Sequence, residues 1–117
     1  YVTNCFLATK VSFANEIFDL CKTMGMNYDE VIDLAKLDTR LGDSHWMVPG
    51  PDGDRGYGGH CFPKDLQAIR YVASRLGIRT HVLDAANMTN NRVRMNRDWE
   101  EMEGRAVINS KKPETQQ

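Results

Sequence analysis

The chain has 117 residues, of which 41% are hydrophobic, and it carries 15 basic and 16 acidic side chains for a net charge of -1. This length suits one compact domain with a modest core. The balanced charge provides no basic face for nucleic acid, and the sequence has no run of about 18 apolar residues that could span a bilayer. Three cysteines, an odd number, argue against a disulfide framework, so we expect a reducing, cytoplasmic location.

Residues 2–24 are predicted to form one long helix, because they contain no Gly or Pro. Apolar residues recur there in two stripes at helical spacing. One stripe holds Leu7, Val11, Ala14, Phe18 and Cys21, and the other holds Phe6, Phe13, Ile17, Leu20 and Met24. Two stripes in so small a domain indicate that another subunit or domain covers part of this helix. The chain is helix-like from its first residue and does not start with Met, so we expect it to be a segment of a longer protein.

A second helix is predicted over residues 28–37. Gly25 ends the first helix as a C-cap, and Asn27 caps the second. The expected inner face of this second helix is Val31, Leu34 and Ala35. Residues 38–60 follow as a long irregular loop with six of the nine glycines, and a loop of this length in a compact domain is commonly functional.

Two further helices complete the predicted all-α fold of about four helices. The third starts near residues 62–63, with Pro63 in its first turn, and runs to residues 76–77. Its expected buried face is Leu66, Ile69, Val72, Ala73 and Leu76. The fourth is expected over residues 80–103, with a looser stripe of Ala85, Met88, Met95, Trp99 and Met102 before Gly104. The predicted helical domain is 1–104, and the polar tail 105–117 is expected to be disordered.

Cys61 is the strongest candidate for chemistry. It follows Gly56, Gly58 and Gly59, which permit close backbone approach or positive φ, and it stands at the start of the third helix. Unpaired N–H groups and the helix dipole favour a thiolate at this position, and Lys64 adds a nearby cation. Asp65 lies one turn further on, so it can face the same side as Cys61 and orient or activate a water.

Other interpretations of these residues stay open. A Gly-rich turn before a helix also packs tightly or binds a phosphate, and a lone cysteine is commonly a small hydrophobic residue, as we expect for Cys5 and Cys21. His60 can act as a base or a metal ligand, but no zinc-type spacing accompanies it. The Gly-rich segment follows no strand, so it is not a dinucleotide fingerprint.

Asn4 is a polar residue on the first apolar stripe, where a buried amide needs a partner. It either makes a structural hydrogen bond to a neighbouring loop or faces Cys61. By contrast, Arg92, Arg94 and Arg97 are interspersed with acidic residues and are expected to form a solvated helix face.

Three segments together resemble the UDP-glucose 6-dehydrogenase family, in its UDP-glucose/GDP-mannose dehydrogenase grouping. They are GYGGHCFPKD at 56–65, which resembles the catalytic signature, NCFLATKVSFANE at 4–16, which resembles the start of the central helix, and DTRLG at 38–42. The three occur in the family's order, and the resemblance spans residues 1–104. It identifies the chain as a central, dimerising domain.

The resemblance implies a two-step oxidation of a sugar's primary alcohol with two NAD molecules. Cys61 would capture the intermediate aldehyde as a thiohemiacetal and then carry a thioester, which water releases as the acid. A thiolate suits both events because it adds readily to an aldehyde and leaves readily from a thioester. Asn4 would hold the reacting oxygen or a water, and Asp65 would assist proton movement or hydrolysis.

The same resemblance implies the binding residues and partners. Tyr57, Gly58 and Gly59 would line the sugar pocket together with Lys64, and Arg40 would reach the substrate of a second subunit. The homodimer would form through the long first helix. NAD would be bound by a separate domain, and the family's catalytic lysine would stand just ahead of Tyr1, so the isolated chain is expected to be inactive.

Two alternatives remain. GDP-mannose and UDP-N-acetyl-sugar dehydrogenases share the Gly-Gly-x-Cys loop, although Phe62 to Asp65 favour UDP-glucose. The chain can also be a dimerisation module without chemistry, in which case Cys61 would have ordinary thiol reactivity.

Overall fold

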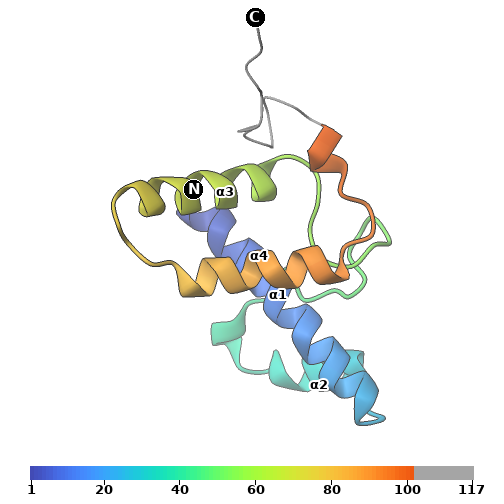
Figure 1. Ribbon diagram of the computed structural model, residues 1–117. Helices are drawn as coiled ribbons and strands as arrows, with labels where there is room; N and C mark the ends of the chain where they lie inside the picture. The colour runs from blue at the N-terminus through green and yellow to red at the C-terminus, as the bar shows by residue number, and fades with distance from the viewer. Residues whose placement is uncertain (102–117) are drawn as a thin grey trace, which may run out of the picture.

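The computed structural model describes residues 1–101, which fold into helices and contain no strand. The elements are α1 (Val2–Thr23), α2 (Tyr28–Ala35), η1 (Thr39–Leu41), α3 (Cys61–Arg75), α4 (His81–Val93) and η2 (Asp98–Glu101). In Figure 1, α3 lies against the N-terminal part of α1, α4 crosses the middle of α1, and α2 lies beside its C-terminal part. The predicted all-α class is confirmed over this range. The predicted tail, Met102 and Gly104 lie outside the described residues.

The two predicted helix signals around Gly25 are confirmed. Gly25 has φ +73°, and the Met26 N–H donates to the Cys21 carbonyl at 2.8 Å. This bond satisfies a free carbonyl at the end of α1. The Asn27 side chain accepts from the Glu30 N–H at 3.0 Å, which caps α2.

The buried side of α1 consists of small and polar side chains rather than the whole predicted stripe. Ala8 and Ala14 are fully buried, and the Ser12 hydroxyl donates to the Ala86 carbonyl of α4 at 2.9 Å. Small side chains allow this close contact between the two helices. The buried residues of α1 are Cys5, Ala8, Ser12, Ala14, Asn15 and Cys21.

The second predicted stripe of α1 is largely uncovered in the described structure. Phe6, Phe13, Leu20 and Met24 are between 53% and 64% exposed, whereas Ile17 is half-buried. The described part of this chain therefore does not supply the cover that the two stripes require.

The predicted inner face of α2 was wrong for Leu34 and Ala35. Both are exposed, and Tyr28 and Ile32 are buried instead. The Tyr28 hydroxyl donates to the Trp46 carbonyl at 2.6 Å. This buried bond fixes the rotation of α2, so that the residue one turn after Tyr28 faces inward.

Two hydrophobic clusters lie along α1. The cluster near α2 contains Ala14, Cys21, Tyr28, Ile32, Trp46 and Val48. The cluster between α1 and α3 contains Cys5, Ala8, Tyr57 and Leu66, with Leu83 of α4 packed against it. Because α1 contributes to both clusters, it connects the α2 end of the domain to the end that carries Cys61.

Helix α3 begins at Cys61, slightly earlier than predicted. Leu66 is fully buried and Ala73 nearly so, as expected, and Ile69 is half-buried. Val72 and Leu76 are exposed at 51% and 68%, so the predicted buried face was too wide. The far end of α3 extends beyond its contact with α1 (Figure 1).

The predicted fourth helix is two separate elements. Helix α4 ends at Val93, Arg94 is extended with ψ 126°, and η2 follows. The prediction of Arg94 as part of a solvated face was wrong, because its side chain is 1% exposed and pairs with Asp52, Asp54 and Asp98. Charge pairing of a buried guanidinium outweighs the modest helix propensity of this segment.

The predicted stripe of α4 was also displaced. Ala85, Met88 and Met95 are exposed, and only Trp99 of the described members is buried. The buried residues of α4 are Ala86, Thr89, Asn90 and Val93. Two of these four are polar, which an apolar pattern does not detect.

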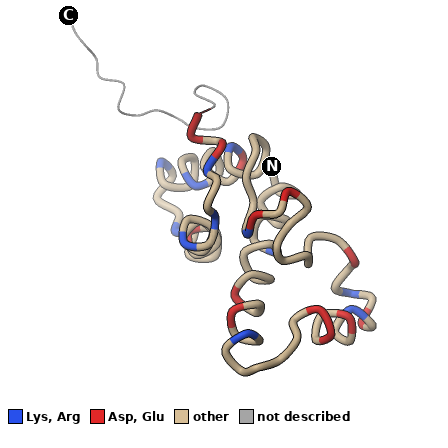
Figure 2. Tube along the Cα trace, turned by 90° about the vertical axis from the view of Figure 1, so that its right-hand side faces the viewer, with Lys and Arg blue, Asp and Glu red and all other residues tan. Residues whose placement is uncertain are grey.

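Charged residues of both signs are interspersed along the described trace, as Figure 2 shows. Within residues 1–101, none of the helices combines the length and the apolarity needed to cross a membrane.

Candidate functional site around Cys61

Cys61 is the exposed cysteine of the chain, whereas Cys5 and Cys21 are buried as expected. It is the first residue of α3, where helix N–H groups point toward the preceding loop. Its sulfur lies 3.8 Å from the His60 Nδ1. A thiol in this position is open to a ligand and has an imidazole beside it.

Asp65 is buried one turn after Cys61, and it is the residue that Asn4 contacts. The Asn4 Nδ2 donates to the Asp65 Oδ2 at 2.8 Å, and the Lys64 ammonium lies 3.0 Å from the Asp65 Oδ1. Burial acts to raise the pKa of Asp65, but the bonds from Asn4 and Lys64 outweigh it and hold the pKa below its usual range. The site therefore contains an ionised, mostly buried carboxylate at neutral pH.

Lys64 faces Asp65 and the start of the chain. Its ammonium lies 5.6 Å from the centre of the Tyr1 ring, a favourable cation–π distance. The hydrogen bond and the charge of Asp65 raise the pKa of Lys64. Lys64 is thus a fixed positive charge next to the Asp65 carboxylate.

Tyr57 points into the core and not toward open solvent. It is 6% exposed, and its hydroxyl has no hydrogen-bond partner within residues 1–101. Burial raises the pKa of Tyr57. The side chain packs in the cluster with Cys5, Ala8 and Leu66, and the backbone hydrogen bonds of Tyr57 are buried as well. A sugar-lining role for the Tyr57 ring stays a prediction.

Asn90 of α4 holds the backbone of Tyr57. The Tyr57 N–H donates to the Asn90 Oδ1 at 2.8 Å, and the Asn90 Nδ2 donates to the Tyr57 carbonyl at 2.9 Å. The neighbouring Gly56 has φ +72°, and a side chain there would overlap the Asn90 Oδ1. The sequence does contain one signal for Asn90, since an Asn inside a predicted helix is unfavourable unless it bonds elsewhere.

Gly58 and Gly59 are held from the segment after α4. The Gly59 N–H donates to the Asp98 Oδ1 at 2.9 Å, and a Cβ on Gly58 would lie 2.6 Å from both the Arg94 Cζ and the Asp98 Oδ1. Neither Arg94 nor Asp98 was predicted to belong to the site. Nothing local to residues 94–98 signals this contact, because its partners lie about 40 positions away.

Arg40 lies in η1, which follows α2 and returns to the middle of α1, where Lys10 donates to the Leu41 carbonyl at 2.8 Å. Its side chain is 88% exposed and pairs with Asp38 at 2.6 Å. The structure does not bring Arg40 to Cys61 of the same chain. Its predicted contact with a second subunit's substrate stays a prediction.

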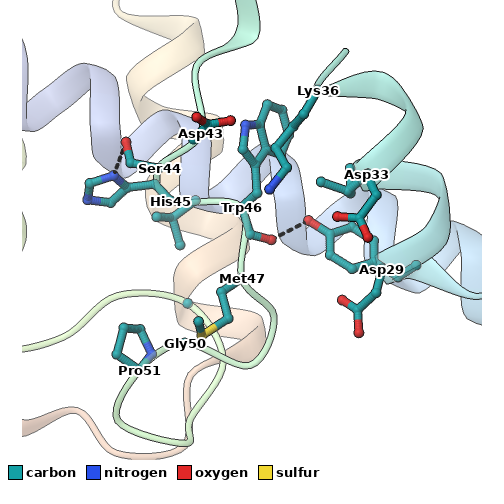
Figure 3. A pocket seen from close by; sticks show the side chains of 14 residues that line it. Asp29, Asp33, Lys36, Asp43, Ser44, His45, Trp46, Met47, Gly50 and Pro51 are labelled. Carbon is teal, nitrogen blue, oxygen red and sulfur yellow. Dashed lines mark hydrogen bonds between the residues drawn. The ribbon is translucent and has the colours of Figure 1, made fainter.

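A cavity of about 500 Å³ lies between α2 and residues 43–51, and Gly56 also lines it. Figure 3 shows Asp29 and Asp33 of α2 and Lys36 just after it on one side, and Ser44 to Met47 on the other. None of the predicted site residues is among the side chains that line it. The cavity lies near the start of α3, since the ring of its lining residue His45 is 5.8 Å from the Phe62 ring.

The described residues do not fit NAD. A Rossmann-type site requires a strand that leads into a Gly-rich turn, and residues 1–101 contain no strand. The space beside Gly58 that a pyrophosphate would approach is filled by Arg94 and Asp98. In the same range, no three His, Cys, Asp or Glu side chains are grouped to hold a metal ion.

Comparison with known proteins gives consistent matches. Residues 1–92 match the sequence model of the UDP-glucose/GDP-mannose dehydrogenase family, central domain. The UDP-glucose 6-dehydrogenase TuaD of Bacillus subtilis is 37% identical over 95 residues, which cover 81% of this chain and 20% of that protein. The UDP-glucose 6-dehydrogenase AglM of Haloferax volcanii is 41% identical over 86 residues, 74% of this chain and 19% of that protein. The UDP-glucose 6-dehydrogenase of Pseudomonas aeruginosa is 39% identical over 92 residues, with 79% and 19% coverage. The chain thus spans about a fifth of the length of these relatives.

Replacing Asn4 with Ala should raise the pKa of Asp65, because the carboxylate loses a donor and stays buried. We expect the loss of this charged hydrogen bond to cost about 1.5 kcal/mol of stability at pH 7. Because the folded-state pKa of Asp65 is below the unfolded value of about 3.9, this contribution is complete above that pH. It is lost as the pH falls through the folded-state pKa. Carboxyl-carbon NMR titration and urea unfolding at pH 7 and pH 2.5 measure both effects.

The matched control is Thr3→Ala, since Thr3 is exposed beside Asn4 on α1. An unchanged Asp65 titration in the Asn4 variant, or a stability loss of the same size at pH 2.5 as at pH 7, would contradict the assignment.

Proposed function

Because the chain belongs to the UDP-glucose/GDP-mannose dehydrogenase family, as its central domain, we propose that it is the cysteine-bearing part of an NAD-dependent UDP-glucose 6-dehydrogenase. The observation that carries the proposal is the exposed Cys61 at the start of α3, followed one turn later by an ionised Asp65 that Asn4 holds. The relatives above are UDP-glucose 6-dehydrogenases by name, which favours UDP-glucose over GDP-mannose or a UDP-N-acetyl sugar.

In this proposal the primary alcohol of the sugar is oxidised to a carboxylate in two hydride removals. NAD supplies the hydride acceptor, and it would be held outside residues 1–101. The chain on its own is therefore expected not to oxidise the sugar. What this chain contributes is the chemistry between and after the two oxidations.

Cys61 acts as the nucleophile. Its thiolate adds to the aldehyde carbon to form a carbon–sulfur bond, which gives a thiohemiacetal and, after the second oxidation, a thioester. Water then attacks the thioester carbonyl, the carbon–sulfur bond breaks and the thiolate is regenerated. Cys61 is the first residue of α3, and its exposed sulfur is open to the aldehyde carbon.

Asp65 and Asn4 act in the hydrolysis step, in which the attacking water loses a proton. An ionised Asp65 carboxylate accepts that proton as a general base. Asn4, which already donates to the Asp65 Oδ2, fixes the carboxylate and presents a polar amide beside the reacting oxygen. Lys64 at 3.0 Å keeps Asp65 ionised between turnovers.

The sugar would approach the loop of Gly58 and Gly59, three and two positions before Cys61, on the side of Gly59, where a Cβ would meet no heavy atom within 4 Å. Small residues allow that approach, and Lys64 lies at the same end of α3. The Arg40 side chain, 88% exposed, would contact the substrate of a second subunit. A reactive, exposed thiol stays reduced in a reducing compartment, so we propose the cytoplasm as its location.

Replacing Cys61 with Ala in the full-length enzyme should lower the rate of glucuronate formation from UDP-glucose by about 10³-fold or more, because the covalent intermediate cannot form. Product formation and NADH release are measured together. Cys21→Ala is the matched control, since Cys21 is buried in the α2 cluster. Full acid formation by the Cys61 variant would overturn the proposal and leave the alternative of a dimerisation module without chemistry.

We also propose that α1 forms a homodimer through its exposed stripe. Val2, Phe6, Phe13, Leu20 and Met24 are separated by four, seven, seven and four positions, so they lie on one side of the helix. Each is more than half exposed. A continuous apolar side of this length on a 22-residue helix is suited to pair with its own copy.

Phe13→Glu places a charge in the middle of this stripe and should convert the dimer to a monomer at micromolar concentration, because an unpaired charge would be buried at the contact. Sedimentation equilibrium of the 117-residue chain measures the mass. Lys22→Glu is the control, because Lys22 lies two positions beyond Leu20 and thus on the opposite side of α1. A dimeric Phe13 variant, or a monomeric unmodified chain, would contradict the proposed surface.

A further inference from the structure

The Gly59 peptide is bound by a carboxylate that lies beyond the residues matched to the family. Asp98 of η2 accepts a hydrogen bond from the Gly59 N–H at 2.9 Å, two positions before Cys61. Gly59 has φ +75°, a backbone conformation that residues with a side chain rarely adopt. This conformation sets the direction of the Gly59 peptide. Asp98 therefore determines the position of the backbone at Gly59, immediately before α3 begins.

Asp98 is itself placed by a buried guanidinium. The Arg94 side chain is 1% exposed, and its Nη2 lies 2.8 Å from the Asp52 Oδ2 and 3.8 Å from the Asp98 Oδ1. The Arg94 Nε donates to the Asn96 carbonyl at 2.7 Å. These contacts tie three segments together: the loop before the glycines, the end of α4 and η2.

The loop at Asp54 and Arg55, which also contacts Arg94, is fixed by carboxylate hydrogen bonds. The Asp54 carboxylate accepts from the Asn96 N–H at 2.7 Å and from the Arg55 N–H at 2.7 Å. Burial acts to raise the pKa of Asp54, but these N–H donors and the charge of Arg94 hold it below its usual value. The hydrogen bond from Arg94 lowers the pKa of Asp52. Both carboxylates are thus charged partners of Arg94 at neutral pH.

Gly58 shows how closely this cluster approaches the loop. A Cβ on Gly58 would lie 2.6 Å from the Arg94 Cζ and 2.6 Å from the Asp98 Oδ1. Such distances leave no room for a side chain at this position. The peptides on both sides of Gly58 are therefore packed directly on the Arg94–Asp98 pair.

We propose that Asp98, held by Arg94, is a positioning residue that sets the Gly58–Gly59 peptides and, through them, the first turn of α3 with Cys61. The inference rests on the proposed function of Cys61 as nucleophile. Asp98 acts only through the loop, because its carboxylate accepts from the Gly59 N–H. This hydrogen bond fixes the loop, and the fixed loop sets how the N–H groups at the start of α3 are oriented toward the Cys61 sulfur. Its role is thus distinct from that of Asp65, which lies within α3.

The test compares the alkylation of Cys61 by iodoacetamide across pH 6–9 in the 117-residue chain, with peptide mapping to separate the three cysteines. Asp98→Ala should slow alkylation of Cys61 at pH 7 by about fivefold and move its pH profile upward, because the N-terminal dipole no longer faces the sulfur at a fixed angle. Asp98→Asn should restore the wild-type rate within about twofold, since the amide oxygen still accepts from the Gly59 N–H. Glu100→Ala, on the exposed side of the same 3-10 helix, is the matched control and should not differ from wild type.

Buried Cys5 and Cys21 report on folding in the same experiment, because they react only if the variant unfolds. If Asp98→Ala exposes these two cysteines, hydrogen exchange of the Gly59 amide in the wild-type chain replaces the alkylation test. A Gly59 N–H bonded to Asp98 should exchange at least about tenfold more slowly than an unprotected amide. An Asp98→Ala chain that is folded and has the wild-type profile, or an unprotected Gly59 N–H, overturns the inference. Activity of the Cys61→Ala enzyme would refute the proposed function alone, since the alkylation difference would remain.

Discussion

Asn90 makes two hydrogen bonds to the backbone of Tyr57: its Oδ1 accepts from the Tyr57 N–H, and its Nδ2 donates to the Tyr57 carbonyl. A buried amide that satisfies both backbone groups of one residue removes the cost of burying either group. On one side of this pair the Tyr57 ring enters the core between α1 and α3. On the other side Gly58 and Gly59 lead to Cys61. The core and the candidate site are thus fixed by the same contact, made by α4 33 positions away.

Local signals in the sequence predicted the elements well. Gly25 and Asn27 were identified as caps because their backbone and side-chain preferences act within a few residues. The start of α3 near Cys61 followed from the glycines before it and from Pro63. Asn4 was identified as a polar residue on a buried stripe, and its amide does bond to Asp65. The caps, the start of α3 and the place of Asn4 on its stripe depend on spacings of a few residues, so the sequence predicts them, whereas the partner of Asn4 lies 61 positions away.

The inward faces of the later helices were not predictable in the same way. In α2 the Tyr28 hydroxyl bond to Trp46 sets the helix rotation, and in α4 the buried positions include Thr89 and Asn90. Arg94 was assigned to a solvated face because its neighbours are charged, yet it is the buried cation of the cluster. Burial of a polar group depends on a partner that is distant in sequence, and an apolar pattern carries no information about that partner.

The central claim is that α4 holds the Cys61 loop through Asn90, and a double-mutant cycle of Gly56→Ala and Asn90→Ala tests it most directly. In the wild-type background an Ala at 56 would overlap the Asn90 Oδ1, whereas removing Asn90 frees that space and leaves the strain of the positive φ and a tight contact with Val93. Urea unfolding of the four chains should therefore give a double variant less destabilised than the sum of the single variants by at least about 1 kcal/mol. Additivity within about 0.4 kcal/mol would contradict the claim, because it would mean that Asn90 and the loop do not share this contact.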